Sequence, residues 1–146
     1  MNVATRKAGF TLLEILTVVL IISILATIVG VKVINKPTQA RIAATQAQIQ
    51  EFRSALQLYK MSHGNYPSQV QGLEALCRQP TAAPVPERYP DGGYLESRNL
   101  PRDQWKNPYV YLVPGADGAP FEIISYGADG EPGGADEASD ISSRDM

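Results

Sequence analysis

The sequence predicts an α+β fold in which one long N-terminal helix packs on a small antiparallel sheet. Residues 10–31 form an almost purely apolar run with one charged side chain, Glu14. A one-sided apolar stripe at helical spacing then continues to about residue 61. Residues 109–113 and 121–126 alternate in the manner of β-strands and are joined by a turn-rich segment. A sheet of this kind buries its apolar face against a helix.

Length and composition limit the classes of protein that remain. The chain has 146 residues and a formal net charge of −2. Its single cysteine and single histidine exclude an intramolecular disulfide and a clustered zinc site. No basic patch typical of nucleic-acid binding is visible. Acidic residues gather instead at the C-terminal end, where Arg144 alone opposes Glu122, Asp129, Glu131, Asp136, Glu137, Asp140 and Asp145.

The apolar run has the features of a helix that spans a membrane. It approaches the roughly 20 residues that such a helix needs. Arg6 and Lys7 precede it, which favours a cytoplasmic N-terminus. A cleaved secretory signal peptide is the common alternative, but this run exceeds the usual length of such a signal and carries an acid at its front edge. An uncleaved anchor would leave Glu14 unexplained, because a lone carboxylate in a bilayer requires a partner.

The segment KAGFTLLEILTVVLIISILATI resembles the class III signal of type IV pilins and pseudopilins. The resemblance implies a leader, residues 1–9, that is cleaved between Gly9 and Phe10, and methylation of the new N-terminal Phe10. Residues 10–35 would then form a transmembrane and assembly helix. In this family, the acid at the position of Glu14 is thought to meet the terminal ammonium of a neighbouring subunit, which here is the Phe10 ammonium of another copy.

The amphipathic continuation supplies the predicted core face of the helix. Its buried side is expected to consist of Ile42, Thr45, Ile49, Phe52, Leu56 and Tyr59. We expect one helix over residues 11–61, with a bend or local melting near Gly30–Pro37, because proline inside a helix removes a hydrogen bond. Residues 81–107, rich in Pro and Gly, are expected to form an ordered loop. The side chains that this loop has to bury are Tyr89, Tyr94, Leu95, Leu100 and Trp105.

A short helix is predicted within residues 68–80. Ser68 and Gln71 have the spacing of a capping box. The face that this helix would bury consists of Val70, Leu73, Leu76 and Cys77. We expect Cys77 to be a small apolar core residue. His63, in the polar turn before this segment, is expected to be solvated.

The C-terminal segment SYGADGEPGGADEASDISSRDM is dense in Asp and Gly. Carboxylates and backbone carbonyls are the oxygen ligands that calcium prefers, and glycine lets the backbone curl so that its carbonyls converge. The segment lacks the EF-hand pattern. A flexible acidic tail explains the same composition, so the residues alone leave both interpretations open.

Four stretches resemble the major pseudopilins of type II secretion systems, the G-type subunits: GNYPSQVQGLEALCRQP, YPDGGYL, LPRDQWKNPYVYLVPG and SYGADGEPGGADEASDI. The resemblance implies a type IV pilin-like fold, a periplasmic domain over residues 36–146 and a calcium loop at about residues 126–141. Gln104 and Lys106–Asn107 stand where the family usually has Pro and Gly. The calcium ligands that the resemblance implies are Tyr126, Asp129, Asp136 and Ala138, with Asp140 as a further candidate.

By the same resemblance, the protein is a structural subunit and not an enzyme. It would cross the inner membrane once, with its N-terminus cytoplasmic and its C-terminal domain periplasmic, and would polymerise into a periplasmic pseudopilus that drives export of folded proteins across the outer membrane. The implied partners are other copies of the chain, minor pseudopilins, the prepilin peptidase and methyltransferase, the inner-membrane assembly platform and secreted substrates. Nucleic acid is not among them.

Two other classes of protein stay open on the residues alone. The first is the major subunit of a type IV pilus, used for adhesion, motility or DNA uptake. Such subunits commonly carry a C-terminal cysteine pair, and the single Cys77 argues against it. The second is a membrane-anchored periplasmic enzyme. The sequence has no nucleophile-elbow motif and no phosphate-binding Gly-rich motif followed by Lys, which argues against catalysis.

Overall fold

The computed structural model describes residues 9–34 and 36–146. The chain divides into two compact units, Met1–Pro37 and Thr38–Met146. Helix α1 spans Leu12–Ile34 in the first unit. Within residues 9–34 and 36–146, no helix is both long enough and apolar enough to cross a bilayer. The membrane span therefore stays a prediction.

The sequence predicts one helix over residues 11–61, and the structure has two. Helix α2 spans Lys36–His63. Residue 35, between the two helices and inside the predicted bend at Gly30–Pro37, lies outside the described residues. Gly30 lies within α1 and does not interrupt it. Pro37 is the second residue of α2, where the first N–H groups of a helix have no intrahelical acceptor, so proline costs little there.

One face of α2 forms the core of the second unit. Ile49, Phe52 and Leu56 are each 0 % exposed, which confirms the predicted apolar stripe. The Phe52 ring packs edge-on against Tyr109, with ring centroids 5.0 Å apart. Burying an apolar side chain of this size contributes roughly 1.5–3 kcal/mol. The later segments complete the core with Leu73, Ala75, Leu76, Cys77, Leu95, Tyr109, Tyr111, Ile123 and Ile141.

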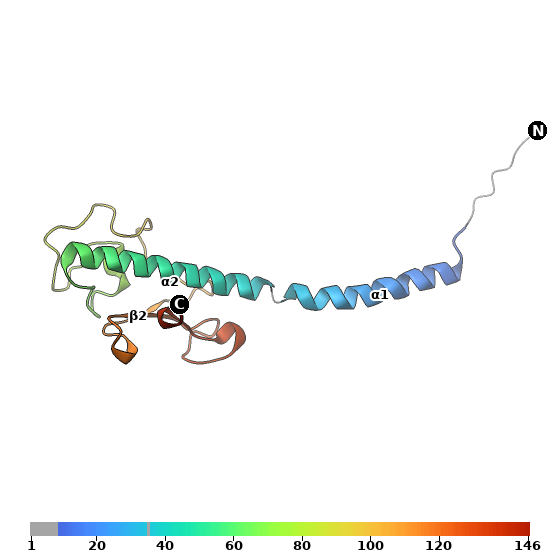
Figure 1. Cartoon of the computed structure of the whole chain (residues 1–146). Helices are drawn as coiled ribbons and strands as arrows, with labels where there is room; N and C mark the ends of the chain where they lie inside the picture. Colours follow the sequence, from blue (N-terminus) through green and yellow to red (C-terminus); the bar gives the residue numbers. More distant parts are fainter. Residues whose placement is uncertain (1–8, 35) are drawn as a thin grey trace, which may run out of the picture. The chain divides into compact units, whose positions relative to one another are not determined.

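Three short strands form an antiparallel sheet in the order β1-β2-β3. β1 (Val110–Leu112) pairs with β2 (Glu122–Ser125), and Tyr111 lies opposite Ile123, which confirms the predicted hairpin. β3 (Ile141–Ser142) pairs with the other edge of β2. It was not expected, because two residues show no alternation. Figure 1 shows β2 and the C-terminal segments along one side of α2, and the green-to-yellow loop around the end of that helix.

The predicted short helix is only a 3₁₀ turn, η1, at Leu73–Leu76. The capping-box contacts do form: the Ser68 N–H donates to the Gln71 side chain at 2.8 Å, and the Gln71 N–H donates to the Ser68 hydroxyl at 3.3 Å. Gly72, however, has φ +61, so the turn does not continue as a right-handed helix. Val70 is consequently 83 % exposed, which corrects its predicted burial. The residues of that face that are buried are Leu73, Leu76 and Cys77.

Residues 81–107 form an ordered loop around the end of α2, as predicted. The Tyr89 hydroxyl donates to the Ala75 carbonyl at 2.9 Å. The Tyr94 N–H donates to the Leu76 carbonyl at 2.7 Å. These bonds tie the loop to η1. The predicted apolar side chains of the loop all lie in the core or pack against it: Tyr89, Tyr94, Leu95, Leu100 and Trp105.

Candidate functional site

The beginning of α1 is organised by Thr11. Its hydroxyl accepts a hydrogen bond from the Glu14 N–H at 3.2 Å, and its carbonyl accepts one from the Ile15 N–H at 3.2 Å, so Thr11 caps the helix. Glu14 lies in the first turn, where the helix dipole favours a carboxylate. Within the described residues, the Glu14 carboxylate makes no hydrogen bond or ion pair.

The described part of α1 exposes its apolar side chains. Between Phe10 and Leu25, every large apolar side chain is between 48 % and 86 % exposed. The hydroxyls of Thr17 and Ser23 donate to backbone carbonyls one turn earlier, so these polar groups are satisfied within the helix. An apolar surface of this extent marks a site that lipid or protein covers.

The predicted leader, residues 1–9, lies outside the described residues except for Gly9. Gly9 and Phe10, the predicted cleavage pair, are both exposed and precede the first residue of α1. The peptide bond that a peptidase would cut is therefore outside the helix.

The acidic loop, residues 126–141, folds back so that its two halves touch. The Ala128 N–H donates to the Glu137 carbonyl at 2.8 Å. A Cβ added to Gly127 would lie 2.5 Å from the same carbonyl oxygen, and a Cβ added to Gly134 would lie 2.3 Å from another carbonyl oxygen of the loop. Only glycine permits such approaches. The segment therefore has a defined shape, unlike a flexible tail.

The predicted calcium ligands lie around this loop. Half-buried among them are Tyr126 and Ala138. Exposed among them are Asp129, Asp136 and Asp140. One Asp129 carboxylate oxygen accepts a hydrogen bond from the Glu131 N–H at 3.2 Å. Both Asp140 oxygens accept from the Gly133 N–H at 3.0 Å. Asp140 is thus engaged with the backbone of its own loop.

The donor chemistry of the loop suits a hard cation, although its acidic side chains are dispersed. Calcium takes six to eight oxygen ligands, and backbone carbonyls serve as well as carboxylates. Across residues 9–34 and 36–146, no three His, Cys, Asp or Glu side chains lie close enough together to hold a metal ion. An ion bound here would therefore depend on backbone carbonyls beside the carboxylates of Asp129 and Asp136. The glycine contacts bring those two stretches of backbone together.

Two acidic residues that the sequence analysis leaves without a role are placed by the tertiary structure. Asp103 is only 4 % exposed and accepts hydrogen bonds from neighbouring backbone and from Ser125. Glu137 accepts a hydrogen bond from the Thr38 hydroxyl and lies 3.7 Å from the Arg41 guanidinium. It ties the acidic loop to the start of α2, although so exposed an ion pair contributes little to stability. The sequence feature that could have pointed to Asp103 is an acidic residue at the start of a turn that is flanked by prolines.

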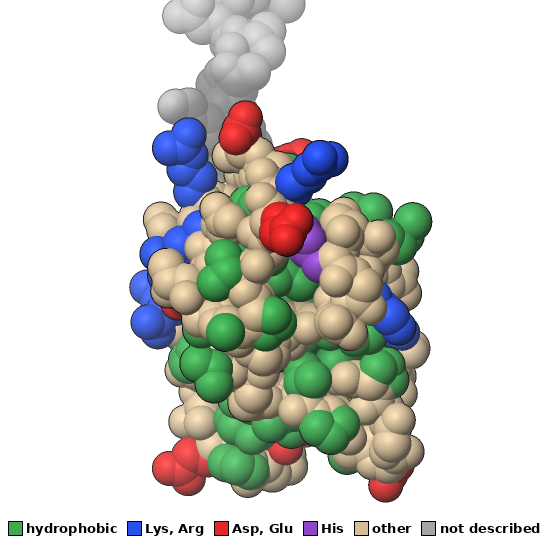
Figure 2. Space-filling view, turned by 90° about the vertical axis from the view of Figure 1, so that its left-hand side faces the viewer, with side chains coloured by type: hydrophobic (Ala, Val, Ile, Leu, Met, Phe, Trp, Pro, Cys, Tyr) green, Lys and Arg blue, Asp and Glu red, His purple; other side chains and the backbone are tan. Residues whose placement is uncertain are grey.

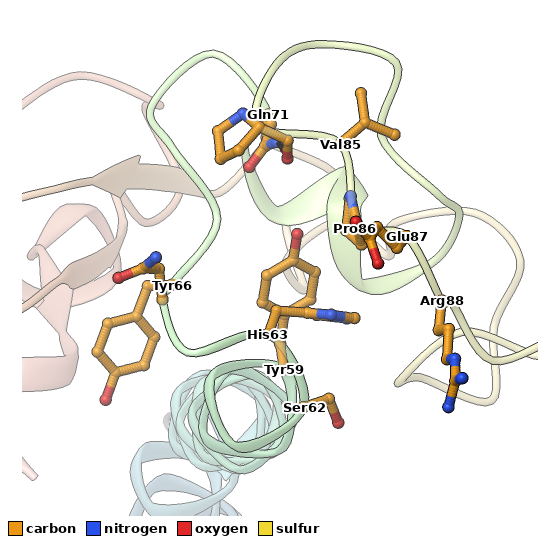
Figure 3. Close-up of a pocket in the computed structure, with 11 residues that line it drawn as sticks. Tyr59, Ser62, His63, Tyr66, Gln71, Val85, Pro86, Glu87 and Arg88 are labelled. Atoms are coloured by element: carbon orange, nitrogen blue, oxygen red, sulfur yellow. Dashed lines mark hydrogen bonds between the residues drawn. The ribbon is translucent and has the colours of Figure 1, made fainter.

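A pocket of about 350 Å³ lies beside the end of α2. Figure 3 shows Tyr59, His63 and Tyr66 on one side of it, with Gln71 and Pro86 across from them. The pocket does not pair a nucleophile with a base, because the adjacent Ser62 hydroxyl donates to the backbone of its own helix. On the face drawn in Figure 2, Lys and Arg side chains are scattered and form no single patch.

His63 is half-buried, and its predicted solvation is wrong. Its Nε2 lies 2.7 Å from the Tyr94 hydroxyl, and its ring stacks on Tyr89 at an interplanar angle of 3°. The cause is the loop of residues 81–107, which folds over the last turn of α2. Cys77 is buried as expected. Burial, followed by the charge of Glu74, raises the pKa of its thiol, so little reactive thiolate forms.

Two family models match this chain. The model described as "Type II secretion system (T2SS), protein G" matches residues 32–144. The model described as "Prokaryotic N-terminal methylation motif" matches residues 4–30. Together they account for both units of the structure.

Similar proteins and a similar structure agree with these matches. A type II secretion system core protein G of Pseudomonas aeruginosa is 45 % identical over 140 residues, which is 96 % of each chain. The protein of the same name from Aeromonas hydrophila is 41 % identical over 141 residues, covering 97 % of this chain and 96 % of that one. The crystal structure of the major pseudopilin of enterohaemorrhagic Escherichia coli matches with a TM-score of 0.63 and 33 % identity, covering 74 % of this chain and 90 % of that chain.

The comparisons also settle what kind of component the chain is. It is a structural subunit and not an enzyme, and it is a component of the pseudopilus of a type II secretion system. The methylation motif associates it with a pseudopilus that is anchored in the membrane and periplasmic. On this evidence, the chain belongs to the family of type II secretion system protein G, the major pseudopilins.

Proposed function

We propose that the mature subunit begins at a methylated Phe10, crosses the inner membrane once with a cytoplasmic N-terminus, and places residues 36–146 in the periplasm. There it polymerises with copies of itself, and growth of the filament drives folded proteins across the outer membrane. The observation that carries the proposal is the exposed apolar surface of α1, where large side chains are 48–86 % exposed. Lipid covers that surface before assembly, and neighbouring copies of α1 cover it afterwards.

The Glu14 carboxylate is proposed as the contact that sets the register of assembly. It has no partner within the described residues, and an isolated charge is costly in an apolar surrounding. Cleavage after Gly9 would create an ammonium on Phe10, and the ammonium of another copy would neutralise Glu14. The pairing requires an incoming subunit to reach one axial position, because only there do the two charges meet.

Further partners follow from the same proposal. A prepilin peptidase and methyltransferase would cut and methylate the Gly9–Phe10 junction, and an inner-membrane platform would feed subunits into the filament. Minor pseudopilins and secreted substrates would contact the periplasmic domain. The exposed position of Gly9 and Phe10 ahead of α1 supports the first of these steps.

Assembly and processing are tested on the full-length chain in a host with the complete secretion apparatus. We expect the intact mass and the N-terminal fragment to give a chain that begins at methylated Phe10. Glu14→Gln keeps the size of the side chain and removes its charge. We therefore expect normal membrane insertion, but loss of the polymer, as detected by chemical cross-linking, and loss of protein secretion. Thr17→Ala, one turn along the same helix, is the matched control and should assemble normally. Normal polymer from Glu14→Gln would refute the pairing.

Calcium is proposed as a ligand of the acidic loop, held by Asp129 and Asp136 with the carbonyls of Tyr126 and Ala138. Two features of the loop support this: its two halves of backbone approach each other closely, and it is rich in carboxylate and carbonyl oxygens. A bound cation would join the two halves of the loop and raise the stability of the folded domain. At a free calcium concentration of about 100 times Kd, the stabilisation is about 2.7 kcal/mol.

The test is thermal unfolding of the detergent-solubilised full chain with calcium, with magnesium and with a chelator. We expect calcium to raise Tm and the double substitution Asp129→Ala with Asp136→Ala to abolish the rise. Asp91→Ala removes an exposed acid from a different loop and should keep the full calcium response. A wild-type Tm that is the same in chelator and in calcium would overturn the proposal.

A further inference from the structure

Asp103 is a buried carboxylate whose hydrogen bonds come from neutral groups. It is 4 % exposed. One of its oxygens accepts from the Trp105 N–H at 3.0 Å and from the Asn107 N–H at 2.7 Å. The other accepts from the Ser125 hydroxyl at 2.6 Å. Within the described residues, no Lys, Arg or His forms an ion pair with it. Such a carboxylate is tolerated because its hydrogen bonds replace hydration.

The network around Asp103 ends on the backbone of Gly127, at the start of the acidic loop. The Ser125 hydroxyl, which donates to Asp103, also accepts from the Gly127 N–H at 3.3 Å. The Asn107 side chain donates to the Gly127 carbonyl at 2.7 Å. Both polar groups of the Gly127 backbone are therefore held, one through Ser125 and one through Asn107. A further contact lies next to these bonds, because a Cβ on Gly130 would sit 3.3 Å from the Asn107 side chain.

Gly127 is the residue on which the shape of the loop depends. Its φ is +60, a conformation that favours glycine. Its Cα lies against the opposite half of the loop, where an added Cβ would be 2.5 Å from the Glu137 carbonyl oxygen. The adjacent Ala128 N–H donates to that same carbonyl. Fixing Gly127 thus fixes how the two halves of the loop meet.

We propose that Asp103, through Ser125, and Asn107 are positioning residues that hold the acidic loop in its closed shape before any cation binds. The segment LPRDQWKNP thereby acts as a preformed support for the loop, contributed by a turn that precedes the sheet. For cation binding the inference rests on the proposed calcium function: a loop that is already closed loses less conformational entropy when it binds an ion. The support itself is a property of the calcium-free protein.

Two substitutions separate this role from the general stability of the fold. Ser125→Ala removes the hydroxyl that links Asp103 to the Gly127 N–H. The hydrogen bonds that the other Asp103 oxygen accepts from the backbone of its own turn stay intact. Asn107→Ala removes the bond to the Gly127 carbonyl, and its own N–H still donates to Asp103. Ser143→Ala is the matched control. Ser143 is also a buried serine whose hydroxyl accepts a hydrogen bond from a backbone N–H, that of Ile123, but it makes no hydrogen bond to Gly127.

The deciding measurement is amide hydrogen exchange of the full-length chain in detergent with a chelator present. We expect amides within residues 127–140 to exchange roughly threefold to tenfold faster in Ser125→Ala and in Asn107→Ala than in the wild type, because each variant loses one hydrogen bond to the loop. In Ser143→Ala, exchange in that segment should match the wild type. Equal exchange of this segment in all three variants would overturn the proposed support.

Calcium titration of the same samples tests the consequence for binding. We expect the calcium concentration at half-saturation to rise roughly threefold to tenfold in Ser125→Ala and to stay unchanged in Ser143→Ala. If the wild type shows no calcium response, the proposed calcium function fails, and the exchange data still decide whether the support exists. If exchange speeds up in Ser125→Ala and its calcium midpoint equals that of the wild type, preorganisation for the cation is refuted.

Discussion

Gly134 and Gly133 are neighbours in the acidic loop and differ in one respect that can be measured. Both have positive φ, +86 and +99 respectively. A Cβ at Gly134 would lie 2.3 Å from the carbonyl oxygen of Ala138 and 2.8 Å from its Cβ, and a Cβ at Gly133 would meet nothing within 4 Å. Gly134→Ala therefore introduces backbone strain and a steric clash, and Gly133→Ala introduces the strain alone.

The magnitudes follow from these two terms. Placing Ala in the left-handed region costs about 1–2 kcal/mol, and the smaller conformational freedom of Ala in the unfolded chain offsets about 0.4–1 kcal/mol of that. We therefore expect Gly133→Ala to lower the free energy of unfolding by roughly 1 kcal/mol. At Gly134, displacing the carbonyl adds about 1–3 kcal/mol, as overpacking generally does.

Thermal unfolding of the full chain, followed by the fluorescence of its single tryptophan, Trp105, checks this expectation. The clash should place the Tm of Gly134→Ala roughly 3–10 °C below that of Gly133→Ala. The comparison is internal, since the two variants share the substituted residue type, the loop and the sign of φ. Equal Tm values for the two would show that the close approach of Gly134 to Ala138 does not exist, and the pinched shape of the loop would have to be abandoned.

Two further predictions concern a strained residue and the buried tyrosines. Lys106 has φ +71, a conformation that favours glycine, so Lys106→Gly should raise the free energy of unfolding by about 0.5–1 kcal/mol in urea titrations. Lys106→Ala keeps the strain and should leave the free energy of unfolding nearly unchanged. Burial raises the pKa of Tyr89 to about 12 and raises the pKa values of Tyr109 and Tyr111 as well. A raised pKa means that the folded state retains its proton while the unfolded state loses it. The contribution of these tyrosines to stability should therefore be constant below pH 10 and fall between about pH 10 and 12. Phenolate absorbance of all seven tyrosines that develops before the fold is lost would contradict this burial.

Local patterns in the sequence were sufficient for the long helical region, the hairpin and most of the core. The stripe that includes Ile49, Phe52 and Leu56 is buried because helical spacing places those residues on one face, whatever they pack against. The same logic failed at Val70. There the spacing was right for a helix, but Gly72 takes a positive φ, and whether a glycine uses that freedom depends on the surrounding fold.

The sites divide in the same way. The proposed Gly9–Phe10 junction, Glu14 and the apolar helix are consecutive in the chain, so their pattern can be seen in the sequence alone. Asp103, Ser125 and Gly127 form no such pattern, since their hydrogen bonds join a turn before the sheet to a loop after it. The partial burial of His63 likewise required the loop of residues 81–107 to fold over the end of α2.

The sequence by itself thus determined the long helical region and the hairpin, because those depend on the spacing of side chains along one segment. Its motifs, through their resemblance to major pseudopilins, indicated the class of protein. Only the tertiary structure decided that the acidic segment is a closed loop held by Asp103 and Asn107, that Ile141–Ser142 extends the sheet, and that His63 is covered. Each of these depends on hydrogen bonds or packing between residues far apart in the chain, and neither composition nor periodicity records which distant groups will meet.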